Sequence, residues 1–164
     1  KDMGINARQS ILYVDVTTPI TTAGTAVTMA NFIPVLCLTS VGFDGTTSAI
    51  DSTSKCTPNG FAESIDGVKG WTISAEGQAY AKAVGETATV KNHNDIFKLW
   101  RSGTPAWWMI ADQTDAEDSL TIRYGVGRID SDSDAFPNND LQTFTPSITG
   151  IGEAFDQDDL DKTP

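Results

Sequence analysis

Short runs of apolar and β-branched residues, separated by turn-forming residues, predict a chain built mainly from strands. Residues 10–16 (SILYVDV) form such a run, and a Thr/Pro/Gly-rich segment follows them, which predicts a strand and then a turn. Residues 32–38 (FIPVLCL) form a second apolar run, and apolar and polar residues alternate between 70 and 75 (GWTISA). A period of two is the signal of a half-buried strand.

The stretch between the last two runs, residues 39–59, is rich in Gly, Ser, Thr and Asp. It is too polar for a core element, so it is predicted to be a long loop. Loops of more than about 12 to 15 residues in a compact domain are usually functional or become ordered against a partner.

Three strands are predicted in the second half of the chain. Residues 106–111 (AWWMIA) are mostly apolar, which indicates a strand buried on both sides. Residues 119–129 and 141–148 also have strand-like composition. The segment 130–140 between them is predicted to be a solvated acidic turn.

One short helix is predicted between the two groups of strands. Asn94 can cap it, and Gly103, followed two residues later by proline, ends it. Ile96, Leu99 and Trp100 have the i, i+3, i+4 spacing of an apolar stripe. A single helix among strands predicts a β-sandwich or barrel with one helix packed on a face.

The composition supports a globular domain. The chain has 164 residues, of which 39% are hydrophobic and 20% charged, and this fits one domain. No run approaches the roughly 18 apolar residues that cross a bilayer. The N-terminus also lacks the layout of a secretory signal, so we expect a soluble, unexported protein.

The acidic charge is concentrated in the last third of the chain. The net charge is −11, and residues 111–164 hold thirteen acids against three bases, whereas residues 1–110 hold nine acids and eight bases. Binding to nucleic acid through its phosphates needs clustered Lys and Arg side chains. The acidic net charge therefore excludes binding by neutralisation of phosphates. The segment 153–164 reads as an acidic C-terminal tail after a domain over 1–152.

The sequence offers little for catalysis. His93 is the only histidine, and no serine elbow or phosphate-binding glycine motif is present. Cys37 and Cys56 have neither zinc nor redox spacing; they are predicted to be reduced thiols, with a single bridge as the alternative. We therefore expect no enzyme, no cofactor and no metal.

One acidic run resembles part of a calcium loop. Asp130, Asp132 and Asp134 match its first three positions, but Ala135 and Leu141 stand where such a loop needs Gly and Glu. A solvated turn is favoured, and cation binding is left as an alternative.

The four tryptophans allow two interpretations. Exposed on one face they could stack on sugars, but tryptophan more often fills a core or an interface. Trp107 and Trp108 are adjacent in a predicted strand and so point to opposite faces. One can fill the core while the other meets the helix or a neighbouring subunit.

Two segments carry a family resemblance. Residues 32–76 contain, in order, a strand ending in CLTS, the polar segment AIDSTSK, and the start of DGVKGWTISAEG, where Asp66 stands in a position commonly held by proline. Residues 125–152 are similar to a closing hairpin that ends in Gly-x-Gly. In this order they resemble the major tail protein, or tail tube protein, of long-tailed bacteriophages, over most of residues 8–153.

The resemblance implies a β-sandwich with one flanking helix and a long inter-subunit loop over 39–59. It implies hexameric rings stacked head-to-tail into a virion tail that is assembled in the host cytoplasm. The expected partners are other copies of the chain, a tape-measure protein in the lumen, and tail terminator and distal tail proteins. DNA would pass through without specific binding, and no membrane is involved.

The same resemblance gives the acidic excess a purpose, since like charge in the bore repels the DNA phosphates. Residues expected to line or rim the lumen are Asp112, Asp115, Glu117, Asp118, Asp130, Asp132, Asp134 and Asp140. Ile50, Trp107 and Trp108 are expected at contacts between subunits. The alternatives are a carbohydrate-binding β-sandwich and an acid-catalysed hydrolase with two carboxylates in a cleft.

Overall fold

The computed structural model describes residues 10–20, 27, 29–51, 64–79, 90–112, 123–138 and 140–156. Within these ranges seven strands form one antiparallel sheet in the order β2-β1-β5-β6-β7-β4-β3. The elements are β1 (Ser10–Asp15), the 3-10 turn η2 (Met29–Asn31), β2 (Ile33–Pro34), β3 (Leu38–Asp51), β4 (Ser64–Gln78), α1 (His93–Ser102), β5 (Ala106–Asp112), β6 (Arg123–Ala135) and β7 (Thr143–Asp156).

The sheet bends so that its two halves share one core. β1, near one edge of the strand order, packs against β3 at the other edge. The buried residues of this cluster come from five strands and from α1, and include Leu12, Ile73, Ile96, Trp108 and Ile148. The prediction of a mainly β, barrel-like fold with one flanking helix is confirmed.

A second apolar cluster covers the other face of β5. Trp107, Met109 and Ala111 alternate with the residues of the first core, and they pack with Tyr124 and Phe32. The predicted strand over 106–111 is therefore confirmed, and it is buried on both sides as its apolar composition indicated.

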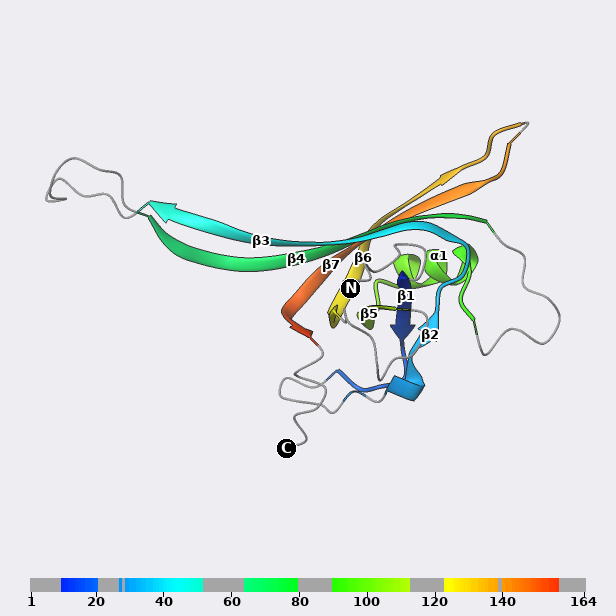
Figure 1. Ribbon diagram of the computed structural model, residues 1–164. Helices are drawn as coiled ribbons and strands as arrows, with labels where there is room; N and C mark the ends of the chain where they lie inside the picture. The colour runs from blue at the N-terminus through cyan, green and yellow to red at the C-terminus, as the bar shows by residue number, and fades with distance from the viewer. Residues whose placement is uncertain are drawn as a thin grey trace, which may run out of the picture.

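Two hairpins leave this body in different directions. Figure 1 shows β3 and β4 as a long paired arm on one side, and β6 and β7 as a second hairpin that runs past α1 on the other. The prediction that 39–59 is a loop was wrong for Leu38–Asp51, which pairs with β4 down to Asp51–Ser64. Because the outer part of the arm is exposed on both faces, it lacks the apolar alternation that predicts a strand. Residues 52–59 lie outside the described part.

The first part of the predicted acidic turn, residues 130–135, is also a strand, whereas residues 136–138 and 140 lie in the connection between β6 and β7. β6 continues to Ala135, which pairs with Thr143 of β7, so Asp130, Asp132 and Asp134 lie within a ladder. Backbone pairing between neighbouring strands stabilises this hairpin, whatever its side chains. β7 likewise runs to Asp156, past the predicted boundary at 152, while residues 157–164 lie outside the described part.

The helix begins two residues earlier than predicted. Its N-cap is Asn92 and not Asn94: the Asn92 side chain accepts from the Asp95 amide at 3.3 Å, and the Asp95 carboxylate accepts from the Asn92 amide at 3.2 Å. This reciprocal pair is a capping box, which requires the acidic residue three positions after the cap. Gly103 ends the helix in the left-handed conformation (φ 63°).

Asp15 closes β1 with a buried carboxylate. It accepts hydrogen bonds from the backbone amides and the hydroxyls of Thr17 and Thr18, two of them at 2.7 Å. Burial acts to raise the pKa of Asp15, but these hydrogen bonds outweigh it and hold the pKa below its ordinary value. The turn after β1 is thus anchored by an ionised side chain.

Candidate assembly surfaces

The long strands β3, β4, β7 and β6 lie side by side and form a sheet with two different faces. Residues paired directly across two strands share a face. One face holds the row Phe43, Ile73, Ile148 and Ile129, which packs into the core. The other face is polar and carries the rows Asp44, Thr72, Thr149 and Arg128; Gly42, Ser74, Ser147 and Ser131; Ser40, Glu76, Thr145 and Ser133.

These three rows are named the polar face. Its residues are exposed or half-buried, and almost all are hydroxyl residues or charged ones. The acids Asp44 and Glu76 were missed as site residues from sequence, because Asp44 lies in the segment predicted as a loop. The alternation of Val41 and Phe43 with polar neighbours was the signal that could have found Asp44.

The predicted lumen acids are divided between different places. Asp130 is 3.5 Å from Arg128, at the edge of the polar face. Asp132 and Asp134 pair with Pro146 and Phe144, which are buried, so these two acids lie on the opposite side of β6. Asp140 is exposed beyond the end of β6.

The other acids predicted to line the lumen have side chains outside the described part of the chain. Asp112 is the last residue of β5, but its side chain is outside the described part. Asp115, Glu117 and Asp118 lie outside the described residues altogether.

Asp132 has an unusual environment. Both carboxylate oxygens are buried and have no hydrogen-bond partner among the described residues. Burial, and then repulsion by Asp134, raise the pKa of Asp132 to about 6, although His93 at the start of α1 acts in the opposite direction. A shielded acid of raised pKa is what a hydrolase would need, but neither of the grooves described below includes Asp132.

Replacing Asp132 by Asn should make stability less sensitive to pH. Because the pKa is higher in the folded state than in the unfolded chain, the contribution of Asp132 is fully present below pH 3.8 and is lost as pH rises through 6. D132N should therefore unfold at a higher denaturant concentration than wild type at pH 7.5 and at nearly the same concentration at pH 4. Asp140→Asn removes the same charge from an exposed residue and serves as control. A D132N effect equal at both pH values would contradict the assignment.

The predicted contact residues have contrasting exposure. Ile50 is 51% exposed on the β3–β4 arm, where it pairs with Ile65, itself 56% exposed. Trp107 and Trp108 are 5% and 1% exposed, so within a single chain they offer little surface to a neighbour. The arm is thus the part of the predicted contact set that is free to meet another molecule.

Trp71 organises the junction between the arm and the body. Its indole stacks on Phe43 of β3, with ring centroids 5.7 Å apart and an angle of 17° between the rings. On its other side lie Gly125 and Gly150, where a side chain would collide with it, and Gly127, where a side chain would collide with Ile148 and crowd the indole. The indole N–H donates to the Gly152 carbonyl at 3.1 Å.

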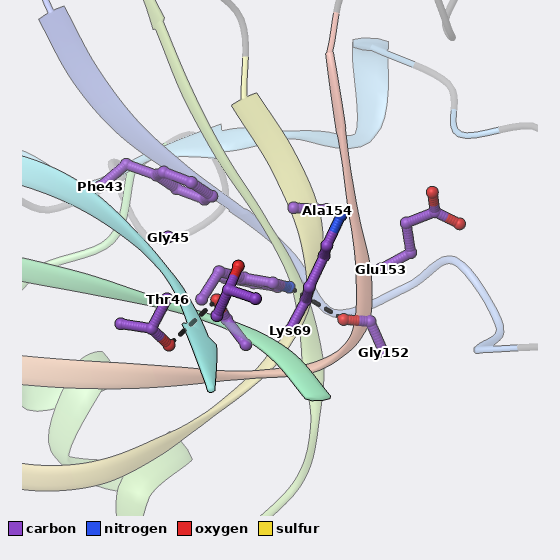
Figure 2. Close-up of a pocket in the computed structure, with 10 residues that line it drawn as sticks. Phe43, Gly45, Thr46, Lys69, Gly152, Glu153 and Ala154 are labelled. Atoms are coloured by element: carbon purple, nitrogen blue, oxygen red, sulfur yellow. Dashed lines mark hydrogen bonds between the residues drawn. The ribbon is translucent and has the colours of Figure 1, made fainter. Parts of the chain in front are cut away.

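A groove opens beside this tryptophan. In the described part of the chain, β4 pairs with β7 only from Thr72 onward, and β7 beyond Gly150 pairs with β6 alone. The strands β4 and β7 therefore separate and leave a fork of about 470 Å³. Figure 2 shows Phe43 and Thr46 on one wall and Gly152 and Ala154 on the other, with Lys69 reaching across. A second groove, lined by Ser40 to Gly42 with Ser74 to Glu76 and Thr145, is shallow and lies on the strands of the polar face.

Neither groove is lined by a histidine or a cysteine. In the part of the chain that the structure describes, no group of three His, Cys, Asp or Glu residues could hold a metal ion. Cys37 is exposed, and Cys56 lies outside the described residues. None of the described helices is long and apolar enough to span a membrane.

The tryptophans do not form a sugar-stacking platform. Trp71, Trp107 and Trp108 are buried, and only Trp100 is exposed, at 39%. Trp100 was predicted to join the apolar stripe of α1, but it packs on Phe97 at the surface, with ring centroids 5.5 Å apart. Ile96 and Leu99 face the core.

No family model matches the sequence, and no curated protein matches it. Solved structures do match the fold. The tail of an empty gene transfer agent particle, with C6 symmetry, has a TM-score of 0.68 at 16% identity and covers 93% of this chain and 98% of its own. The virion of a native gene transfer agent particle has a TM-score of 0.67 at 15% identity, over 94% and 99% of the two chains.

The SPP1 tail tube has a TM-score of 0.62 at 12% identity, and the match covers 93% of this chain and 78% of that one. At these identities the likeness concerns the fold. The chain therefore has the fold of proteins that build phage and phage-like tails.

Proposed function

We propose that the chain is a major tail protein of a phage or phage-like particle, a structural protein that assembles as hexameric rings stacked into a tail tube. The observation that carries this proposal is the four-stranded part of the sheet, β3, β4, β7 and β6, which has an apolar face packed on the core, the polar face on its other side, and free edges. Together with the tail-tube fold it favours a wall around an aqueous bore over a monomeric binding module.

Free strand edges supply the means of closing a ring. Among the described strands, β3 is the last of the sheet and pairs only with β4. On the other side, β5 pairs with β6 only as far as Gly127, which leaves 128–135 unpaired on that edge within the described residues. Pairing β3 of one copy with this part of β6 in the next copy would remove both edges. Six copies are proposed from the C6 symmetry of the gene transfer agent tail.

In such a ring the polar face would line the bore. Asp44, Glu76 and Asp130 would then repel DNA phosphates, while the hydroxyl residues keep the wall wet and give no basic patch for binding. Of the acids predicted from sequence, Asp130 fits this surface directly. Asp112, Asp115, Glu117, Asp118 and Asp140 stay predictions for the rim, and Asp132 and Asp134 would lie on the outer side of the wall.

This function requires no catalysis and no cofactor. The partners would be further copies of the chain, a tape-measure protein within the bore and tail terminator and distal tail proteins at the ends. DNA would pass through the bore into the host. The carbohydrate-binding alternative is not favoured, because it needs several exposed indoles on one face.

The test is negative-stain electron microscopy of the purified protein at rising concentration, with sedimentation to count subunits. We expect six-fold rings and hollow tubes, which form more readily as salt screens the net charge of −11. A protein that stays monomeric at high concentration and raised salt would contradict the proposal.

A further inference from the structure

The surface of α1 that faces away from the core has an unusual composition for a solvent-exposed helix. Phe97 and Trp100 are 41% and 39% exposed, and their rings are in contact. Lys98 and Arg101 lie beside them and are also exposed. Aromatic residues flanked by cations, on an otherwise acidic chain, are typical of a contact surface. These four residues are named the helix patch.

The end of the β6–β7 hairpin has the complementary composition. Phe136 and Leu141 are 71% and 59% exposed. Asp134 and Asp140 are exposed on either side of Phe136 in the sequence, and no Lys or Arg occurs between residues 130 and 142. The residues Asp134, Phe136, Asp140 and Leu141 are named the hairpin tip.

The two surfaces do not meet within one chain. β6 contacts α1, but Figure 1 shows the hairpin continuing past α1 so that its tip extends well beyond the helix. Two complementary patches held apart on the same molecule are the requirement for a heterologous, head-to-tail contact that repeats along an assembly.

We propose that the helix patch of one copy binds the hairpin tip of a neighbouring copy, with Phe136 and Leu141 packed on Phe97 and Trp100, and with Asp134 and Asp140 facing Lys98 and Arg101. This proposal rests on the proposed self-assembly and specifies one of its contacts. The β3–β4 arm is a poorer match for the hairpin tip, because its outer part carries Asp51 and Asp66 and would repel the acidic tip.

Charge reversal on each surface tests the contact. A helix variant (K98E/R101E) and a hairpin variant (D134K/D140K) should each raise the concentration needed for tube formation by about tenfold or more, because like charges would then face each other. A chain that carries all four substitutions restores opposite charges and should form tubes near the wild-type concentration. Electron microscopy and sedimentation of the full chain report the outcome, and thermal unfolding of each variant confirms that it folds.

A matched control separates the contact from net charge. K91E/R123E shifts the net charge by the same amount as the helix variant, and neither residue belongs to the helix patch, the hairpin tip, the polar face or the β3–β4 arm. It should therefore raise the concentration needed for tube formation much less than the helix variant does. Its combination with the hairpin variant should not recover assembly. The hairpin variant itself lowers the net repulsion between copies, so its loss of assembly is the reverse of what net charge alone predicts.

The remaining outcomes overturn the proposal in distinguishable ways. Wild-type tubes that are unaffected by either reversal would reject this contact and leave the proposed function intact. Two assembly-deficient, folded variants whose combination fails to recover would show that the patches meet other surfaces. A wild-type protein that never assembles would reject the proposed function together with this contact.

Discussion

Replacing Gly150 by alanine is expected to destabilise the folded chain by about 3 kcal/mol or more, at the upper end of what overpacking a core costs. A Cβ atom at this position would lie 2.1 Å from Cε2 of Trp71 and 2.4 Å from two further indole atoms. The indole cannot easily move away, because Phe43 stacks on it and its N–H donates a hydrogen bond to the Gly152 carbonyl. The strands of the β3–β4 arm and of β7 would have to separate.

The measurement is the midpoint of denaturant unfolding with the slope compared, so that a change in stability is separated from a change in cooperativity. Gly45→Ala is the matched control, because a Cβ atom there meets nothing within 4 Å. G150A should also cost less when Trp71 is already replaced by valine, since the collision is with the indole itself. Equal stability of G150A and G45A would contradict this account of the packing around Trp71.

The second large effect concerns the adjacent tryptophans of β5. Trp108 is 1% exposed and its indole N–H donates to the Gly127 carbonyl at 3.1 Å. Trp108→Ala is expected to cost about 3 to 5 kcal/mol through lost burial and the cavity left behind. Trp107 is also buried, but its indole N–H has no acceptor among the described residues.

Phenylalanine substitutions at the two positions isolate the hydrogen bond. W108F removes the indole hydrogen bond to Gly127, whereas W107F removes no hydrogen bond among the described residues. W108F should therefore be the less stable of the two variants by about 1 to 3 kcal/mol. Both are measured on unassembled protein at low concentration. The reverse order would contradict the hydrogen-bond assignment. If W107F leaves the monomer stable but impairs ring formation, the sequence-based prediction that Trp107 contributes to a subunit contact gains support.

The raised pKa of Asp132 has a bearing on assembly as well. Asp132 interacts with His93 at the start of α1, and it is two residues from Asp134 of the hairpin tip. Protonation of Asp132 below pH 6 removes one of the charges that repel Asp134. The pH dependence of stability and that of tube formation can therefore be compared in the same D132N variant.

The sequence by itself determined the elements whose side chains meet the core. The runs at 10–16, 70–75 and 106–111 became β1, part of β4, and β5, because strands in contact with a core must place apolar residues on the buried face. The end of the helix at Gly103 could also be predicted, because local backbone geometry decides where a helix ends. The order of the motifs in residues 32–76 and 125–152 also predicted the tail-tube fold that the comparisons found.

Only the tertiary structure decided the features that depend on pairing between distant segments. The outer arm and the acidic half of β6 are strands because a partner strand satisfies their backbone groups, and exposed side chains leave no periodic signal. A one-residue bulge at Ile129 to Ser131 and the register with β7 fix which acids share a face. That register separates Asp130 from Asp132 and Asp134. The pairing of β3 with β4 joins Asp44 and Glu76 on a surface that no local pattern connects.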